Sequence, residues 1–172
     1  MIPLMSFSQN LGFYDLEMGM SKSQVESLLH DKGLVIRNRL NAHIFLGGDF
    51  ENEPYNTFEV DFSGSGKLDR LNFVFGPYKE SECIEMYRRI KNLVSNKFSQ
   101  LHNEDLTRFK LNVKPKTDTE ILEAIKNKKG SLLNIWIKTH ALIISLFLNN
   151  LDQEWVENGF FITLGFESLE ID

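Results

Sequence analysis

Three acidic residues alternate with other residues in a glycine-flanked stretch, in a spacing that could bind a metal ion. Asp49, Glu51 and Glu53 match the first three ligand positions of an EF-hand calcium loop. Such a loop also needs a glycine at its sixth position and a glutamate at its twelfth, where this chain has Pro54 and Val60. The sequence therefore excludes an EF-hand site.

The same stretch carries two aromatic residues, Phe50 and Tyr55, among its acids. No regular hydrophobic period runs through residues 47–56, so we predict an exposed loop. Aromatic side chains surrounded by charge are typical of protein interfaces. We therefore take Asp49, Phe50, Glu51, Glu53 and Tyr55 as candidate protein-binding residues. An ordinary polar loop with both rings turned inward is the alternative.

Other patterns of catalytic residues are incomplete. The segment 64–67, Gly-Ser-Gly-Lys, has the composition of the end of a phosphate-binding loop, but Leu68 stands where a hydroxyl residue should bind magnesium. It also joins two expected strands, whereas a phosphate loop precedes a helix. No zinc-binding spacing relates the histidines, which are His30, His43, His102 and His140. We predict no catalytic residue, no metal site and no cofactor.

Charge is distributed in three blocks along the chain. Residues 1–62 carry 4 Lys/Arg and 9 Asp/Glu, residues 63–139 carry 15 and 9, and residues 140–172 carry 0 and 6. The basic middle block could bind nucleic acid, which would require aromatic side chains for stacking. Only Phe109 lies between its cations, and the alternation around it turns the ring inward. We expect solvated charged faces here and treat nucleic acid as an unlikely partner.

A hairpin from Thr57 to Gly76 organises the elements that must position these residues. Apolar side chains alternate along both of its strands and share one face. They are Phe58, Val60, Phe62, Leu71, Phe73 and Phe75. A two-stranded hairpin is only marginally stable in water, so this apolar face must be covered by further sheet or by helices.

Helices and further strands surround the hairpin in the sequence. A capping box of Ser21 and Gln24 begins a helix over residues 22–32, a long helix covers 79–102, and a third begins at Asp118 or Thr119. Expected strands are 34–40, 43–46, 107–113, 132–138, 141–148 and 160–167, with 13–20 as a short strand or extended segment. This order predicts an α+β fold, mainly antiparallel sheet packed against helices.

We expect a single domain over residues 1–172. It contains, as a hypothesis, two similar halves, 12–76 and 106–167, joined by the helix 79–102.

Cysteine usage and hydropathy indicate the compartment. Cys83 is the only cysteine, so an intramolecular disulfide is excluded. The first residues lack the basic and apolar segments of a secretion signal. The apolar run 132–148 contains Asn134, Lys138 and His140, so we do not expect it to span a membrane. We expect a cytoplasmic protein.

Two segments resemble one known group of proteins. Residues 19–29, Gly-Met-Ser-Lys-Ser-Gln-Val-Glu-Ser-Leu-Leu, are similar to its opening helix, and residues 58–73 to its later strand, Gly-Lys-Leu turn and strand. The group is the superfamily of the β-lactamase inhibitory protein and the small lipoproteins of bacterial outer-membrane assembly. The resemblance lies mainly in the first half. It implies a fold that binds proteins through a concave sheet face and its loops, and it implies no catalysis.

On this resemblance, the polar face of the hairpin belongs to the functional surface. It carries Thr57, Glu59, Asp61, Arg70 and Asn72, and we add Glu59 and Asp61 to the candidate protein-binding residues. The lipoproteins of the group carry a lipidated cysteine near the mature N-terminus. Cys83 lies in the middle of an expected helix, so we do not expect a lipoprotein role.

Three hypotheses of function follow. The first is a non-enzymatic protein-binding domain, such as an inhibitor or immunity protein, that occludes a partner with a basic surface. The second is a small-ligand-binding protein or enzyme with a pocket between sheet and long helix. The third is nucleic-acid binding through the basic middle segment. Partner identity and oligomeric state stay open.

Overall fold

The computed structural model describes residues 11, 13–34, 37–39, 42–110, 115–138, 142–151 and 159–169. The helices in this part of the chain are α1 (Lys22–Asp31), α2 (Glu80–Lys97) and α3 (Asp118–Lys126). The strands are β1 (Arg37–Arg39), β2 (Ala42–Phe50), β3 (Glu53–Phe62), β4 (Leu68–Tyr78), β5 (His102–Asp105), β6 (Arg108–Phe109), β7 (Gly130–Lys138), β8 (Leu142–Leu151) and β9 (Gly159–Ser168).

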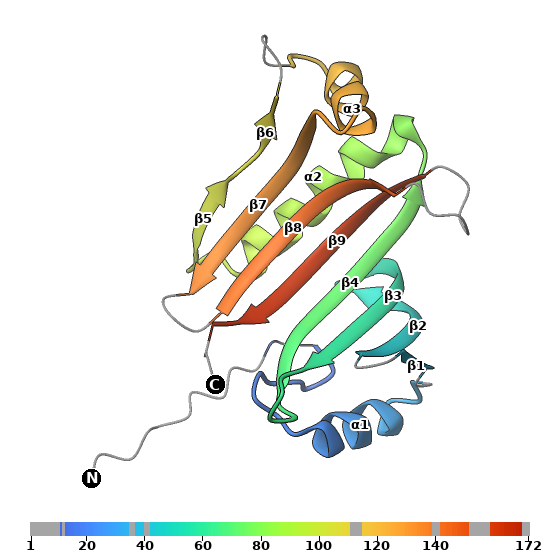
Figure 1. Ribbon diagram of the computed structural model, residues 1–172, viewed down its shortest axis with the longest axis vertical. Coiled ribbons are helices and arrows are strands. Elements are labelled where there is room, and N and C mark those ends of the chain that lie inside the picture. Colours follow the sequence, from blue (N-terminus) through green and yellow to red (C-terminus); the bar gives the residue numbers. More distant parts are fainter. Residues whose placement is uncertain are drawn as a thin grey trace.

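One antiparallel sheet contains all the described strands, in the order β1-β2-β3-β4-β9-β8-β7-β5, with β6 also paired to β7 (Figure 1). The predicted α+β fold with a mainly antiparallel sheet is confirmed. Each half of the chain supplies a helix and then a run of neighbouring strands, α1 with β1 to β4 and α3 with β7 to β9. The last strands of the two runs, β4 and β9, pair at the centre of the sheet. That the halves are a repeat stays a prediction.

The hydrophobic core lies on one face of the sheet. The predicted hairpin forms as β3 and β4, and Phe58, Val60, Leu71, Phe73 and Phe75 are at most 1% exposed. Helix α2 covers the core behind β7, β8 and β9 in Figure 1. The large ring of Trp136 on β7 is also in this core, 1% exposed.

The two short helices begin with the same device. Ser21 and Gln24 form a capping box at α1, as predicted, and Thr117 and Glu120 form one at α3. In each box, two backbone N–H groups that have no partner inside the helix are satisfied reciprocally. Each helix then buries a short apolar stripe against the sheet, led by Val25 in α1 and Leu122 in α3.

Several sequence predictions differ from the fold. The predicted helix 79–102 ends earlier, since α2 stops at Lys97 and His102 begins β5. Residues 13–20 form turns, with positive φ at Tyr14 and Asp15, and make no strand of the sheet. In place of the predicted strand 107–113, the structure has two short strands that pair with β7: β5, which ends before residue 107, and β6, which begins at residue 108. Residues 111–114 of that prediction lie outside the described part of the chain. Of the alternating segment around Phe109, only Arg108 and Phe109 form a strand within the described residues, as β6.

Candidate functional site

The predicted acidic loop is the tip of the β2–β3 hairpin. Phe50 pairs with Glu53 across the tip, and Glu51 and Asn52 form a two-residue turn with φ of 51° and 68°. A tight hairpin turn of this kind usually needs Gly, or Asn followed by Gly, because both residues have positive φ. The prediction of an irregular loop is therefore wrong. It failed because Glu51-Asn52 lacks the glycine that usually marks a tight hairpin turn in a sequence.

The two aromatic residues of the tip are buried. Phe50 is 1% and Tyr55 2% exposed, so the prediction that they are exposed anchors is wrong. Burial along β3 changes phase between Tyr55 and Phe58, opposite Gly47 and Gly48, which have φ of 67° and 144°. Glycine adopts such angles readily, and a side chain does not. These glycines allow the tip to turn both rings into the core.

The acids of the tip are bound to helix α2. Glu53 is buried, and its Oε1 lies 2.5 Å from Nη2 of Arg89. Glu51 forms an ion pair with Lys97. These two carboxylates therefore fasten the hairpin to α2, on the core side of the sheet. Asp49 is exposed and makes no ion pair with a residue that the structure describes.

A shallow cavity of about 330 Å³ lies beside the tip, lined by Phe13, Tyr14, Asp49, Glu51, Asn52 and Phe73. The hydroxyl groups of Tyr14 and Tyr55 are 2.6 Å apart at this place. Burial, then this hydrogen bond, raises the pKa of Tyr55. Lys97 Nζ lies 4.9 Å from the centre of the Phe13 ring. The ring of Phe13, which lines the cavity, thus already has a cation of the same chain over it.

Glu59 and Asp61 do not lie with the tip. Both are half-exposed, and they point to the opposite face of the sheet from Phe58 and Val60. The structure therefore separates the predicted residues into two groups. One group lies at the hairpin tip, where Glu51 and Glu53 bind α2, and the other lies on the face of the sheet that α2 does not cover.

That second face, called the open face below, is a regular array of side chains. In the strand order β7, β8, β9, β4 and β3, its rows are Ile137-Ile143-Glu167-Arg70-Asp61, Ile135-Ser145-Gly165-Asn72-Glu59 and Leu133-Phe147-Thr163-Val74-Thr57. All but Gly165 are at least partly exposed. Asn134, between two of these residues on β7, accepts a hydrogen bond of 3.1 Å from Tyr87 of α2. The open face is therefore the side away from α2.

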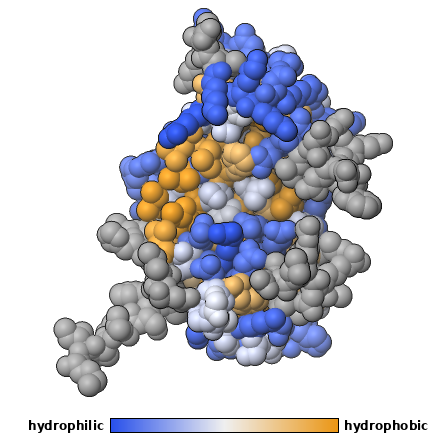
Figure 2. Space-filling view, in the orientation of Figure 1, coloured by the Kyte–Doolittle hydropathy of each residue, from blue (hydrophilic) through white to orange (hydrophobic). Residues whose placement is uncertain are grey.

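One half of the open face is apolar. Figure 2 shows a hydrophobic area over β7 and β8, beside a hydrophilic area nearer β4. The apolar patch consists of Leu133, Ile135, Ile137, Ile143 and Phe147. The two strands that carry it are apolar on both faces, because Trp136, Ile144, Leu146 and Leu148 point into the core. The sequence predicted buried strands here, because a continuous apolar run does not reveal which face is uncovered.

Pairs of polar side chains border the apolar patch on both sides. On β5, Nε2 of His102 lies 3.1 Å from Oε1 of Glu104. On the other side, Arg70 Nη2 lies 2.9 Å from Glu167 Oε1, and this hydrogen bond raises the pKa of Arg70. Exposed pairs of this kind contribute little to stability, about 0–1 kcal/mol. An apolar centre with a polar rim is the usual composition of a protein-binding surface.

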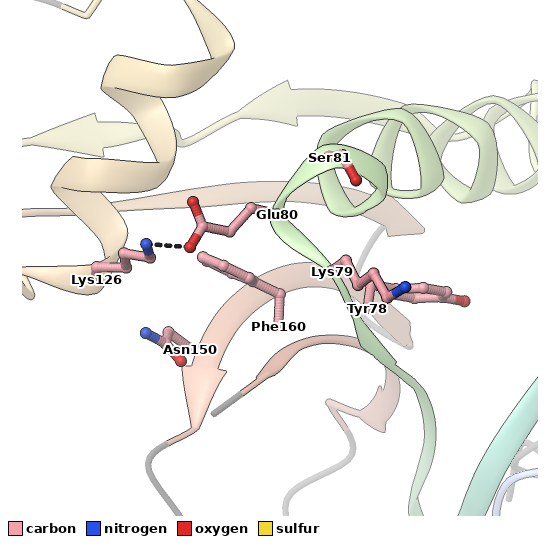
Figure 3. A pocket seen from close by; sticks show the side chains of 7 residues that line it. All are labelled: Tyr78, Lys79, Glu80, Ser81, Lys126, Asn150 and Phe160. Atoms are coloured by element: carbon pink, nitrogen blue, oxygen red, sulfur yellow. Dashed lines mark ion pairs between the residues drawn. The ribbon is translucent and has the colours of Figure 1, made fainter. Parts of the chain in front are cut away.

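A larger cavity, of about 760 Å³, lies where β4 leads into α2 (Figure 3). It is lined by Tyr78, Lys79, Glu80, Ser81, Lys126, Asn150 and Phe160. Glu80 and Lys126 point toward one another in Figure 3 and form an ion pair. Burial raises the pKa of Tyr78. The Glu80 carboxylate and the Lys126 ammonium thus neutralise one another in this lining.

The cations of α2, which were candidates for phosphate contacts, are bound to acids. The two terminal guanidinium nitrogens of Arg88, Nη1 and Nη2, contact Asp118 at 2.9 and 2.6 Å, and Lys91 Nζ lies 3.8 Å from Asp105. Arg89 and Lys97 pair with the hairpin tip, as described above. Phosphate binding would require these internal pairs to break, which weakens the case for nucleic acid.

Three further observations concern reactive groups and membranes. No group of three or more His, Cys, Asp and Glu side chains gathers within the described residues, of which His140 is not one. Cys83 is buried in α2, and burial raises the pKa of its thiol to about 11. In the described part of the chain, every helix is too short or too polar to cross a membrane.

Comparison with protein-family models, with curated proteins and with solved structures finds no match to this chain.

Proposed function

We propose that this chain is a non-enzymatic domain that binds another protein through its open face and occludes the surface it binds. The observation that carries the proposal is the apolar patch on β7 and β8, which is partly exposed and bordered by pairs of polar side chains. In a monomer, a sheet face of this composition leaves apolar area exposed to water. Burying that area against a partner is favourable by about 25 cal/mol per Å².

The resemblance to the β-lactamase inhibitory protein supports the same proposal. Inhibitors of that group also use a sheet face, and the polar face of the β3–β4 hairpin, with Glu59 and Asp61, continues the apolar patch across the sheet. We place this protein in the cytoplasm. A single buried cysteine, with no disulfide, supports this compartment.

The proposal is tested by co-purification of the tagged chain with its partners. The test variant Ile135→Thr/Ile143→Thr/Phe147→Thr keeps strand-forming residues and removes most of the apolar patch. The control variant Glu82→Gln/Glu85→Gln changes two exposed residues of α2, which lies on the other side of the sheet. We expect the test variant alone to lose its partner. Partners retained by the test variant would exclude the open face.

A second candidate function is small-ligand binding in the cavity at the start of α2. The observation that favours it is the volume, about 760 Å³, which is in the range of ligand sites. Phe160 supplies an apolar wall and Asn150 a hydrogen-bonding side chain. A thermal-shift screen of metabolites tests this candidate, with Phe160→Ala/Asn150→Ala expected to abolish any shift.

A further inference from the structure

The apolar patch is too small to hold a protein partner by itself. Adjacent strands are about 4.8 Å apart and alternate residues about 6.7 Å apart, so its five positions cover about 160 Å² of the sheet plane. A stable interface buries about 800 Å² on each partner. A partner on the patch must therefore extend over neighbouring parts of the open face. Toward β5 the sheet ends, so the larger extension is across β9 and β4 to β3.

The surface on that side is acidic. Among the side chains that the structure describes on the five strands from β7 to β3, the open face carries Glu59, Asp61 and Glu167 against a single cation, Arg70. Glu167 is paired with Arg70, whereas Glu59 and Asp61 make no ion pair with a residue that the structure describes. Among the described side chains of β3, β4 and β9, the open face therefore has a net negative charge, which acts over about 8 Å at physiological salt.

From these positions, and resting on the proposed function, we infer that the partner surface is apolar at one end and cationic at the other. Its apolar side chains lie on β7 and β8. Its Lys or Arg side chains lie over Glu59 and Asp61, three strand spacings or about 14 Å from β8. Such an arrangement pairs each desolvated acid with a cation and fixes the direction in which the partner lies.

A second copy of this chain fits the open face less well. Two copies related by a twofold axis that runs parallel to the strands over β9, the central one of these five strands, would bring the acidic half of each over the apolar half of the other. Glu59 and Asp61 would then lose water without gaining a cation, which is unfavourable. An axis through the acidic half would instead bring like charges together.

Two fluorescent amphipathic peptides of about 18 residues, or five helical turns, provide the test. In the first peptide, one helical face carries leucines along its first half and lysines along its second half, and the matched peptide has glutamates in place of the lysines. Fluorescence anisotropy at about 50 mM salt measures the binding of each to the full chain. We expect the Leu/Lys peptide to bind at least about tenfold more tightly than the Leu/Glu peptide.

Three variants of the chain locate the contact. Glu59→Gln/Asp61→Asn is expected to weaken Leu/Lys binding about fivefold, and Ile135→Thr/Ile143→Thr/Phe147→Thr about tenfold or more. Glu82→Gln/Glu85→Gln removes the same charge from α2 and is expected to change binding less than twofold. Equal effects of the two charge variants would overturn the inference, as would equal binding of both peptides or no binding of either.

Co-purification of the natural partner and measurement of the oligomeric state distinguish failure of the inference from failure of the proposed function on which it rests. If co-purified partner is lost with the triple threonine variant but is unaffected by Glu59→Gln/Asp61→Asn, the inference fails and the proposed function stands. If the threonine variant retains its partner, the proposed function itself fails. A dimer of the wild-type chain in sedimentation, abolished by the threonine variant, would assign the open face to a second copy and overturn the inference.

Discussion

Glu53 of β3 and Arg89 of α2 form an ion pair in which one member is buried and the other is not. The Glu53 side chain is 5% exposed and the Arg89 side chain 62% exposed, with 2.5 Å between their oxygen and nitrogen atoms. The pair connects the tip of the β2–β3 hairpin to the helix that covers the core. Glu53, one of the predicted binding residues, thus has a structural role.

Loss of Arg89 should destabilise the protein far more than loss of its neighbour. Arg89→Met leaves the Glu53 carboxylate buried without its cation, at a cost of about 2 kcal/mol. Arg88→Met is the matched control, since its pair with Asp118 is exposed on both sides and contributes less than about 1 kcal/mol. Urea unfolding measures both. Equal losses of unfolding free energy would show that burial of Glu53 has no energetic consequence.

Two adjacent glycines in β2 should respond differently to alanine. A Cβ on Gly48 would overlap the ring of Tyr55, and its φ of 144° is unsuited to a side chain, so Gly48→Ala should cost about 3 kcal/mol or more. Gly47 has φ of 67° and open space around it, so Gly47→Ala should cost only about 1 kcal/mol. Thermal unfolding compares them. A milder effect at Gly48 would contradict the packing of Tyr55 over this residue.

The Tyr87 hydroxyl should contribute measurably to the stability of the core. It lies 3.1 Å from Oδ1 of Asn134 and 3.3 Å from the carbonyl oxygen of Leu146, and burial raises its pKa. Tyr87→Phe leaves Asn134 with an unsatisfied acceptor, so we expect a loss of about 1–2 kcal/mol. Tyr78→Phe, at a half-buried ring, should lose less than about 0.5 kcal/mol. Equal losses of stability in the two variants would show that Asn134 finds another hydrogen-bond donor.

Cys83 should be unreactive in the folded protein. With a pKa of about 11, only about one thiol in a thousand is ionised at pH 8, whereas about a quarter is ionised at the ordinary pKa of about 8.5. Because the folded pKa is raised, reactivity should increase as the pH rises toward 11. Iodoacetamide labelling followed by mass spectrometry should modify Cys83 slowly in buffer and rapidly in urea. Rapid labelling of the native protein would mean that this part of α2 is accessible.

The fold could be predicted where the sequence states one periodicity clearly. Strict alternation from Phe58 to Phe75 predicts the β3–β4 hairpin and its buried face, and the Ser21–Gln24 capping box predicts the start of α1. The tip of the β2–β3 hairpin could not be predicted. Its Glu51-Asn52 turn lacks glycine, and Gly47 and Gly48 change the burial phase inside a strand.

The open face could be predicted only in its polar half. Alternation in the hairpin places Glu59 and Asp61 opposite the apolar residues, and they lie there. In β7 and β8 the apolar residues follow one another without interruption, so Ile135 and Trp136 look equally buried in the sequence. Only the position of α2 in the tertiary structure distinguishes them, and the periodicity of the sequence does not contain it. Sequence patterns predicted the strands and not their uncovered side.

Photo-crosslinking in living cells tests the central claim, that the open face contacts another protein. The photoreactive amino acid p-benzoylphenylalanine replaces Ile135 on the open face or, as the control, Glu85 on the exposed side of α2. Both variants should fold, because neither side chain lies in the core. We predict a discrete crosslinked partner from position 135 and none from position 85. Crosslinks from position 85 alone, or from neither position, would contradict the claim.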